Sequence, residues 1–193
     1  IKQEIFLNQL QGYNKHFFMG GSANWGDING FLNNNVDNII IHEEDSYDIP
    51  ETNAWGISDY HLLQETHAVL SKETQPFISL VLTAGHHRPY TIPDQIPGFD
   101  KSGFTAEHQK FSFGEDDFYA FKFMDFALGQ FMKNAKSADY FDNTLFVIFG
   151  DHGSFGHHLN KSHGDLTIHE YHVPLIFYGP GLNILPSTYK KIA

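Results

Sequence analysis

The stretch FDNTLFVIFGDHGSFGHHLNKSHGD, residues 141–165, joins a strand-like segment directly to a turn that is rich in ionisable side chains. Residues 143–149 form a mostly apolar run, which is typical of a buried strand. Asp151 and His152 follow at once, and a carboxylate beside a neutral imidazole is ordinary ligation chemistry for divalent metal ions. The flanking glycines, Gly150 and Gly153, allow a turn that aims both side chains at one point. The alternative is a strand-end turn with a chance histidine, since the chain contains 13 histidines.

A second apolar run, PFISLVL over residues 76–82, predicts another strand that is buried on both faces. Polar residues again follow the strand, here His86, His87 and Arg88. A histidine beside an arginine suits an anionic oxygen substrate, because both side chains donate hydrogen bonds and can carry positive charge. The alternative for this pair is a capped turn before Pro89.

Predicted helices separate the predicted strands, an order that indicates an α/β fold with a mostly parallel sheet flanked by helices. We interpret residues 1–193 as one domain. Ligands of such sheets bind beyond the carboxyl ends of the strands, so we expect Asp151-His152 and His86-His87 to lie at one edge. Residues 89–113 are expected to form a long surface loop. The predicted helices cover residues 27–35, 59–72 after an N-cap at Ser58, and 116–135, and the remaining strands cover 15–18, 36–41 and 173–178.

Further candidate residues lie in glycine-rich parts of the chain. His157, His158 and His163 share the loop after Gly153 and could supply additional metal ligands or proton donors, or simply belong to a solvated loop. Trp25 is either an anchor in the core or a wall of a substrate pocket, since an indole has a large apolar face and one donor. Trp55, before Gly56, is interpreted as structural.

The composition excludes several classes of function. The net charge is -11 with only 12 Lys and Arg, and no basic cluster occurs, so the electrostatic footprint of a nucleic-acid-binding protein is missing. An acidic chain would repel an anionic substrate unless a bound cation reverses the local field, which favours a metal. The sequence contains no cysteine, which excludes thiolate metal sites, disulfides and a cysteine nucleophile, and it has no apolar run long enough to cross a membrane.

Together these stretches resemble the sulfatase and alkaline phosphatase superfamily, in particular its membrane-anchored phosphoglycerol transferases of the lipoteichoic acid synthase type. The combination of two stretches is the most specific, YFDNTLFVIFGDHG over residues 140–153 and HVPLIFYGPG over 172–181. Three others support it in the same order, GGSANW over 20–25, WGISD over 55–59 and HRPYTIP over 87–93. The resemblance covers nearly the whole chain and implies an alkaline phosphatase-like sheet.

The resemblance also implies roles for individual residues. Asp151 and His152 match the family's metal-binding Asp-His pair, and the metal implied is manganese, with zinc, magnesium and calcium as alternatives. His87 matches a substrate-binding histidine, with Arg88 beside it, and Trp25 matches a tryptophan that lines the substrate pocket. The arginine that usually follows that tryptophan has no counterpart, because Gly26 and Asp27 stand there. The family's threonine nucleophile and acidic metal ligand are expected upstream of Ile1, so the chain is interpreted as the C-terminal portion of a catalytic domain.

Three functional hypotheses follow from the resemblance. The first is a transferase that moves phosphoglycerol from a membrane lipid to a glycan or lipid acceptor. The second is a hydrolase of phosphate or sulfate esters. The third is that these 193 residues alone are an inactive fragment. An extracytoplasmic location, at the outer face of the cell membrane or in the periplasm, is implied by the resemblance alone.

Overall fold

The structure is a computed structural model, and it describes residues 3–110, 112–153 and 171–180. The chain divides into two compact units, residues 1–135 and 136–193, which are described separately below. The interpretation of residues 1–193 as one domain therefore stays a prediction.

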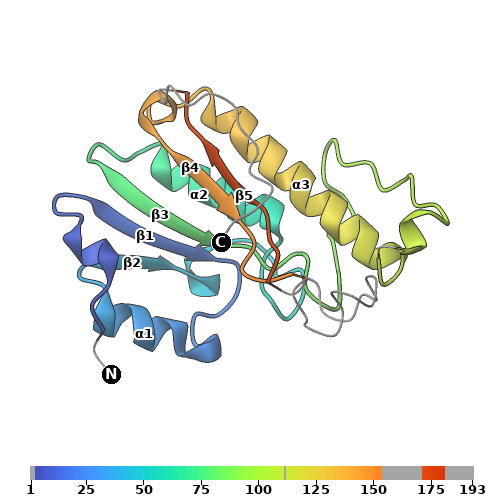
Figure 1. The fold of residues 1–193 in the computed structure, drawn as a ribbon, viewed down its shortest axis with the longest axis horizontal. Coiled ribbons are helices and arrows are strands. Elements are labelled where there is room, and N and C mark those ends of the chain that lie inside the picture. The colour runs from blue at the N-terminus through green and yellow to red at the C-terminus, as the bar shows by residue number, and fades with distance from the viewer. Residues whose placement is uncertain (1–2, 111, 154–170, 181–193) are drawn as a thin grey trace. The chain divides into compact units, whose positions relative to one another are not determined.

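The first unit contains a three-stranded parallel sheet with strand order β2-β1-β3 (Figure 1). β1 spans Asn14–Met19, β2 spans Ile39–His42 and β3 spans Phe77–Leu82. β1 is central: His16 pairs with Ile40 of β2 and with Ser79 of β3. The parallel sheet and its helices confirm the predicted α/β class, and all three strands end at the same edge of the sheet.

The helices of the first unit begin and end close to the predicted residues. The Ser58 hydroxyl accepts a hydrogen bond from the His61 N–H at 3.4 Å, as expected of an N-cap. Among the helices of the described residues, none combines the length and apolarity needed to cross a membrane. The α-helices are α1 (Ile28–Asn35), α2 (Asp59–Leu70) and α3 (Glu115–Ala135), and the 3-10 helices are η1 (Phe6–Gln9), η2 (Trp25–Asp27), η3 (Glu44–Ser46) and η4 (His108–Lys110).

The core of this unit is built on β1 rather than on the most apolar strand. Phe17 and Met19 pack with Leu32 and Val36 of the α1 region, and Phe18 on the opposite face is completely buried. The prediction that residues 76–82 are buried on both faces is wrong, because Leu80 is 38% exposed and the rest of β3 is partly buried. The physical reason is position: β3 lies at an edge of the three-stranded sheet, and the buried central place belongs to β1.

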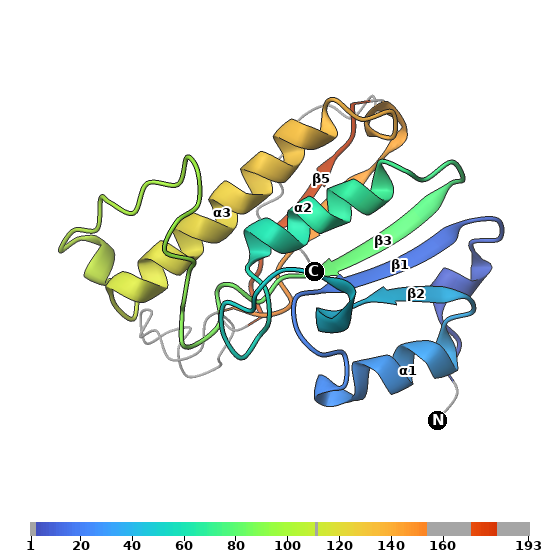
Figure 2. The same cartoon turned by 180° about the vertical axis from the view of Figure 1, so that it is seen from behind.

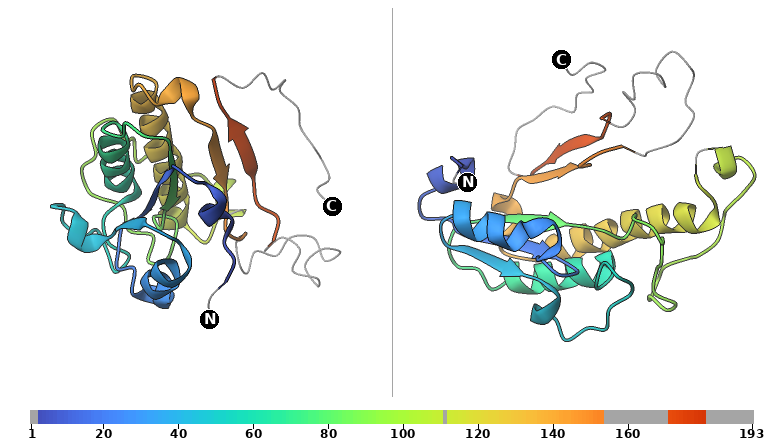
Figure 3. Two further views of the ribbon diagram at one scale, coloured as in Figure 1. Left: turned by 90° about the vertical axis from the view of Figure 1, so that its left-hand side faces the viewer. Right: turned by 90° about the horizontal axis from the view of Figure 1, so that it is seen from below.

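The loop between β3 and α3 is largely exposed, as predicted, and residues near its middle contact α3. Figures 2 and 3 show α3 beside α2. The Phe99 ring lies 5.1 Å from the Phe123 ring, and Lys122 Nζ donates to the carbonyl oxygens of Asp100 and Ser102 at 2.7 and 2.9 Å. These contacts hold the middle of the loop against α3.

The second unit contains an antiparallel pair, β4 (Phe146–Phe149) with β5 (Leu175–Tyr178), after the short helix η5 (Phe141–Asn143). Phe141 is buried, and its ring lies 5.7 Å from the Phe146 ring. The prediction of a fully buried strand here is wrong, because Val147 is 42% and Phe149 62% exposed. A two-stranded ribbon has no neighbouring strands to cover its edges and buries only the face that packs on another element.

Candidate functional site

The loop that carries Trp55 is fixed against the C-terminal end of β1. The Ile57 N–H donates to the Gly20 carbonyl oxygen at 3.0 Å. Gly56 has a φ of 93°, and a Cβ at this position would overlap the backbone of Gly20. A close approach of two backbones with a positive φ requires glycine. The glycines of GGSANW and WGISD therefore hold these two stretches together.

This docking places Trp55 in contact with both Trp25 and His87. The Trp25 and Trp55 rings meet edge to face with centroids 5.6 Å apart, and the Trp55 and His87 rings lie 4.1 Å apart. We call Trp25, Trp55 and His87 the aromatic shelf. Trp25 is 60% exposed, which argues against a core anchor and leaves the face of its indole open to a ligand. Trp55, interpreted as structural from the sequence, is the middle member of the shelf.

Hydrogen bonds determine which nitrogen of His87 faces outward. His87 Nδ1 lies 3.0 Å from the carbonyl oxygen of Arg88. A carbonyl oxygen can only accept, so Nδ1 carries the proton and the neutral ring has its lone pair at Nε2. The same Arg88 carbonyl accepts a hydrogen bond from Trp55 Nε1 at 2.7 Å. His87 is thus held in one orientation, with Nε2 as the atom for a ligand.

The charged groups around His87 come from the same segment and from α3. The Arg88 guanidinium lies over the Phe113 ring, 5.3 Å from its centroid, and Arg88 is exposed. His86 Nε2 lies 2.7 Å from Asp117 Oδ1, on the first turn of α3. The structure therefore assembles the predicted residues Trp25, His87 and Arg88 in the first unit, and an anion at His87 would lie near the Arg88 charge.

Asp151 and His152 lie in the second unit, in the turn after β4. Asp151 Oδ1 accepts a hydrogen bond from the His152 N–H at 2.9 Å, and Asp151 Oδ2 lies 3.6 Å from His152 Nε2. His152 Nδ1 donates to the Gly153 carbonyl oxygen at 2.8 Å, so the neutral ring carries its lone pair at Nε2. Both side chains are exposed. The predicted convergence of this pair with His87 joins two units and stays a prediction.

The Asp151-His152 pair has the chemistry of a divalent metal site. A carboxylate oxygen and an imidazole Nε2 lone pair, with the other ring nitrogen bonded to a carbonyl, are the donors that manganese or zinc accepts. The described ranges contain no cluster of three or more His, Asp or Glu side chains arranged to hold a metal ion. The further predicted ligands His158 and His163, together with His157, lie outside the described residues.

The sequence analysis missed two buried carboxylates, Asp59 and Asp117, that bond to the residues just before His87. Asp59 is 2% exposed and accepts hydrogen bonds from the N–H groups of Ala84 and Gly85 at 3.1 and 3.0 Å. Burial has the largest effect and raises the pKa of Asp59 above its ordinary value, although these two N–H donors and the charge of His86 oppose the shift. Asp117 is 6% exposed. Each lies in the first turn of a helix, where acidic residues are common, so the sequence offers no signal that separates them from ordinary helix starts.

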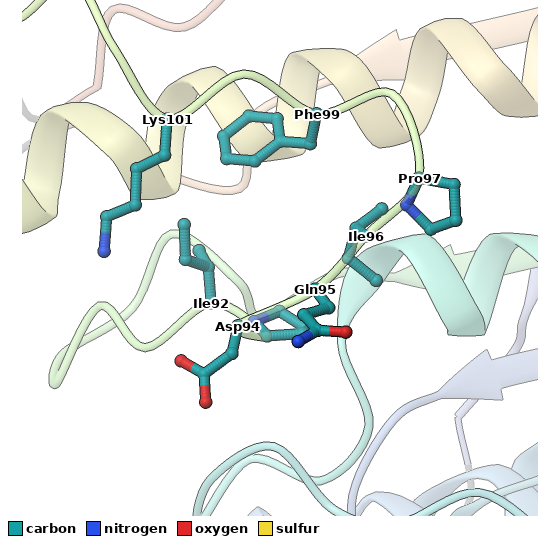
Figure 4. A pocket seen from close by; sticks show the side chains of 8 residues that line it. Ile92, Asp94, Gln95, Ile96, Pro97, Phe99 and Lys101 are labelled. Atoms are coloured by element: carbon teal, nitrogen blue, oxygen red, sulfur yellow. The ribbon is translucent and has the colours of Figure 1, made fainter.

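A cavity of about 520 Å³ lies elsewhere in the first unit, inside the loop of residues 92–101. Figure 4 shows Phe99 on one limb of the loop across from Ile92 and Asp94 on the other. None of the predicted site residues lines this cavity. The exposed aromatic shelf, rather than this cavity, carries the side chains that can do chemistry.

Comparison with known proteins agrees with the order of motifs and with the fold. The family model described as Sulfatase matches residues 5–184. Lipoteichoic acid synthase 1 of Bacillus subtilis (strain 168) is 26% identical, over 91% of this chain and 28% of the relative. Phosphoglycerol transferase I of Xanthomonas euvesicatoria pv. vesicatoria (strain 85-10) is 28% identical, over 74% of this chain and 20% of the relative. The chain thus spans between about a fifth and a little over a quarter of the length of these relatives.

Two solved structures are similar to this one. A protein of the alkaline phosphatase superfamily from Vibrio parahaemolyticus has a TM-score of 0.68 and 32% identity, covering 89% of this chain and 39% of that one. The lipoteichoic acid synthase LtaP from Listeria monocytogenes has a TM-score of 0.70 and 18% identity, covering 92% of this chain and 46% of that one, which supports the fold. The family match over most of the chain, with the predicted fold, shows that this chain belongs to the sulfatase family within the alkaline phosphatase superfamily.

Proposed function

We propose that the chain is part of a metal-dependent transferase that moves phosphoglycerol from a membrane-lipid donor to a glycan or lipid acceptor. The observation that carries the proposal is the fixed orientation of His87, with Nε2 outward on the aromatic shelf and the Arg88 guanidinium on the next residue. This arrangement suits a phosphate ester, whose oxygens accept hydrogen bonds and bear negative charge. The relatives named lipoteichoic acid synthase and phosphoglycerol transferase support the same substrate class.

Asp151 and His152 would hold a divalent cation, manganese in the first place, through a carboxylate oxygen and His152 Nε2. When bound, such an ion lowers the pKa of a hydroxyl nucleophile and offsets charge on the nonbridging oxygens. The cation would also offset the repulsion between this acidic chain, with its net charge of -11, and a negatively charged phosphate ester. Zinc, magnesium and calcium are the alternatives to be compared in the assay.

His87 would act on the oxygens of the ester. As an imidazolium it donates its Nε2–H to a nonbridging oxygen or to the leaving group, while Nδ1–H stays bonded to the Arg88 carbonyl. The adjacent guanidinium favours the anionic ester by charge and hydrogen bonding. The exposed Trp25 face would form the wall against which the apolar side of a glycerol or lipid headgroup packs.

A hydrolase of phosphate or sulfate esters is the second candidate, and the description of the matched family as Sulfatase favours it. The same residues would serve, with water in place of an alcohol acceptor. The transferase and the hydrolase therefore differ in acceptor and in the ester they cleave.

We propose that the protein works at the extracytoplasmic face of the membrane, where a lipid donor would be available to it.

The test uses the full-length protein with Mn²⁺ and vesicles that contain phosphatidylglycerol. We expect release of diacylglycerol, abolished in Asp151→Ala and reduced about 100-fold or more in His87→Ala, because one oriented donor to the transition-state charge contributes that much. Parallel assays with a chromogenic sulfate ester and a chromogenic phosphate diester separate the hydrolase. The 193-residue chain by itself is expected to be inactive in all three assays.

Matched controls exclude a general effect of each substitution. Asp142→Asn changes an exposed acidic residue at the other end of β4, and His67→Ala changes a histidine in the last turn of α2, away from Asp59 at its start. Both should keep wild-type turnover. Near wild-type diacylglycerol release by Asp151→Ala would contradict the proposal, and cleavage of the sulfate ester without the lipid would replace the transferase by a sulfatase.

A further inference from the structure

We infer that Asp59 and Asp117 are positioning residues for His87. These two buried carboxylates, on α2 and α3, accept hydrogen bonds from the residues just before His87 and so hold the segment of residues 84–88 in place. The inference rests on the proposed role of His87 and adds a pair of residues that act through it. Neither carboxylate belongs to the aromatic shelf, and neither was predicted from the sequence.

The clamped segment consists of two consecutive turns that meet at His87. The His87 N–H donates to the Ala84 carbonyl oxygen at 3.1 Å, and the Tyr90 N–H donates to the His87 carbonyl oxygen at 2.8 Å. A segment of turns has few hydrogen bonds of its own and gains rigidity only from the elements around it. The direction of the His87 ring therefore depends on what holds its neighbours.

Asp59 holds the first turn. Its Oδ1 accepts from both Ala84 and Gly85 N–H, and Oδ2 also lies 3.2 Å from the Gly85 nitrogen. A Cβ at Gly85 would lie 2.5 Å from Asp59 Oδ2, so the turn approaches the carboxylate as closely as glycine permits. The cavity that Asp59 lines has a volume of about 10 Å³, at most one water molecule, which keeps a phosphate ester away from this carboxylate.

Asp117 holds His86, the residue before His87, and the backbone of Phe113. Its Oδ1 accepts from His86 Nε2 at 2.7 Å, and its Oδ2 accepts from the Phe113 N–H at 2.7 Å. The Phe113 ring in turn lies under the Arg88 guanidinium. One carboxylate thus fixes His86 directly and supports the platform of Arg88. Its place in the first turn of α3 stabilises its negative charge.

Burying a carboxylate at Asp59 and at Asp117 is energetically unfavourable compared with burying an apolar side chain. Taking an ionised carboxyl group out of water is unfavourable unless several donors compensate it, and an apolar residue would fill the same volume without that cost. All the donors described above for Asp59, and one of the two for Asp117, come from the segment beside His87. Both carboxylates therefore stabilise one geometry of this segment more than they stabilise the unit as a whole.

A positioning role predicts coupling to His87, which a double-mutant cycle measures. In the full-length enzyme with Mn²⁺ and phosphatidylglycerol vesicles, Asp117→Asn should lower kcat about tenfold or more with a small change in KM, because misplacing a catalytic group by a fraction of an ångström has effects of this size. The same substitution added to His87→Ala should change the rate by less than about twofold, because the group it positions is gone. Asp59→Asn should behave in the same way.

Asp116→Asn is the matched control, since Asp116 lies in the same first turn of α3, is exposed, and loses the same charge. It should leave the rate within about twofold in both backgrounds. A second readout needs neither metal nor substrate: the side-chain ¹⁵N shifts of His87 in the full-length protein. Wild type and Asp116→Asn should show one tautomer with the proton on Nδ1, and Asp117→Asn should show a mixture of the two tautomers.

Three results would overturn the inference: an unchanged rate in Asp117→Asn, an equal loss of rate in the His87→Ala background, or a single unchanged His87 tautomer.

If Asp117→Asn does not fold, His86→Gln and His86→Ala replace it. Gln keeps an N–H donor for Asp117 and should retain most of the rate, whereas Ala should lose it, and equal rates would overturn the inference. Should His87→Ala itself keep wild-type turnover, the proposed function of His87 fails, and the tautomer measurement still decides whether the carboxylates orient the ring.

Discussion

The aromatic shelf and the Asp151-His152 turn are both regions at the end of a strand, yet they are held in different ways. His87 is oriented by Trp55 and by a segment bonded to Asp59 and Asp117, residues far from it in the sequence. Asp151 and His152 bond to each other and to Gly153. The first region is preorganised by the fold, and the second has a local geometry that a bound cation would complete.

Substitutions in the two regions should therefore change different properties of the protein. A preorganised region depends on backbone contacts between distant segments, so a change in packing there should reduce stability. The Asp151 and His152 side chains are exposed, so a change there should affect ligand binding and leave stability nearly intact. The first two predictions below test this contrast, and the third, with the weakest effect, concerns a buried histidine of the first unit.

The largest effect is expected from Gly56→Ala in the first region. A methyl group here would collide with the Gly20 backbone and would force a positive φ of 93° on a residue with a Cβ. We expect a loss of about 3 kcal/mol or more in the free energy of unfolding, measured by urea denaturation. Gly12→Ala is the control, with a φ of 77° and no atom near the added methyl group, and should lose about 1 kcal/mol. Equal losses would mean that the close approach of the two loops contributes nothing.

The next effect concerns the turn after β4. Calorimetric titration of Mn²⁺ and Zn²⁺ into the full-length protein should show binding that is weakened at least about 100-fold by Asp151→Ala, because a carboxylate ligand is removed. The urea midpoint without metal should stay the same. His87→Ala should retain wild-type metal affinity, and a comparable loss in that variant would show that the two regions are not separable in this way.

The smallest effect is a pH dependence of stability in the sheet of the first unit. His42 Nε2 lies 3.1 Å from His16 Nδ1, and His16 Nε2 lies 3.1 Å from Glu73 Oε1. Burial lowers the pKa of His42, and the charge of His16 lowers it further. In the unfolded chain, His42 has a pKa of about 6.5 and binds a proton more readily than in the folded state. The free energy of unfolding is therefore highest above this pH and falls as the pH drops below it.

Urea denaturation at about pH 7.5 and about pH 5.5 measures this effect, on either side of the ordinary histidine pKa. His42→Gln removes the titrating group and keeps an N–H donor for His16, so its loss of stability on acidification should be smaller than that of wild type, by less than about 1 kcal/mol. The exposed His172 provides the control His172→Gln. Identical acid sensitivity in wild type and His42→Gln would rule out this contribution.

The local elements could be predicted well because their signals are local. Ser58 caps α2 as expected, and α3 and β3 begin within one residue of the prediction. Burial was predicted poorly for the strands, because apolar content indicated residues 76–82 as the buried strand. The central place instead belongs to β1, although Lys15 and His16 are among its buried residues. Strand order decides which strand is central, and no single strand's composition encodes that order.

The family and the α/β class could be predicted from local patterns, namely short motifs and the alternation of helices and strands, and the same motifs nominated Trp25, His87, Arg88, Asp151 and His152 as candidates. The contact of Trp55 with both Trp25 and His87, and the bonds of Asp59 and Asp117 to the neighbours of His87, became visible only in the folded chain. An acidic residue in the first turn of a helix looks the same in sequence whether it faces solvent or another segment. The contacts that give it a function run between residues 25 or more positions apart, and only the packing of the chain brings them together.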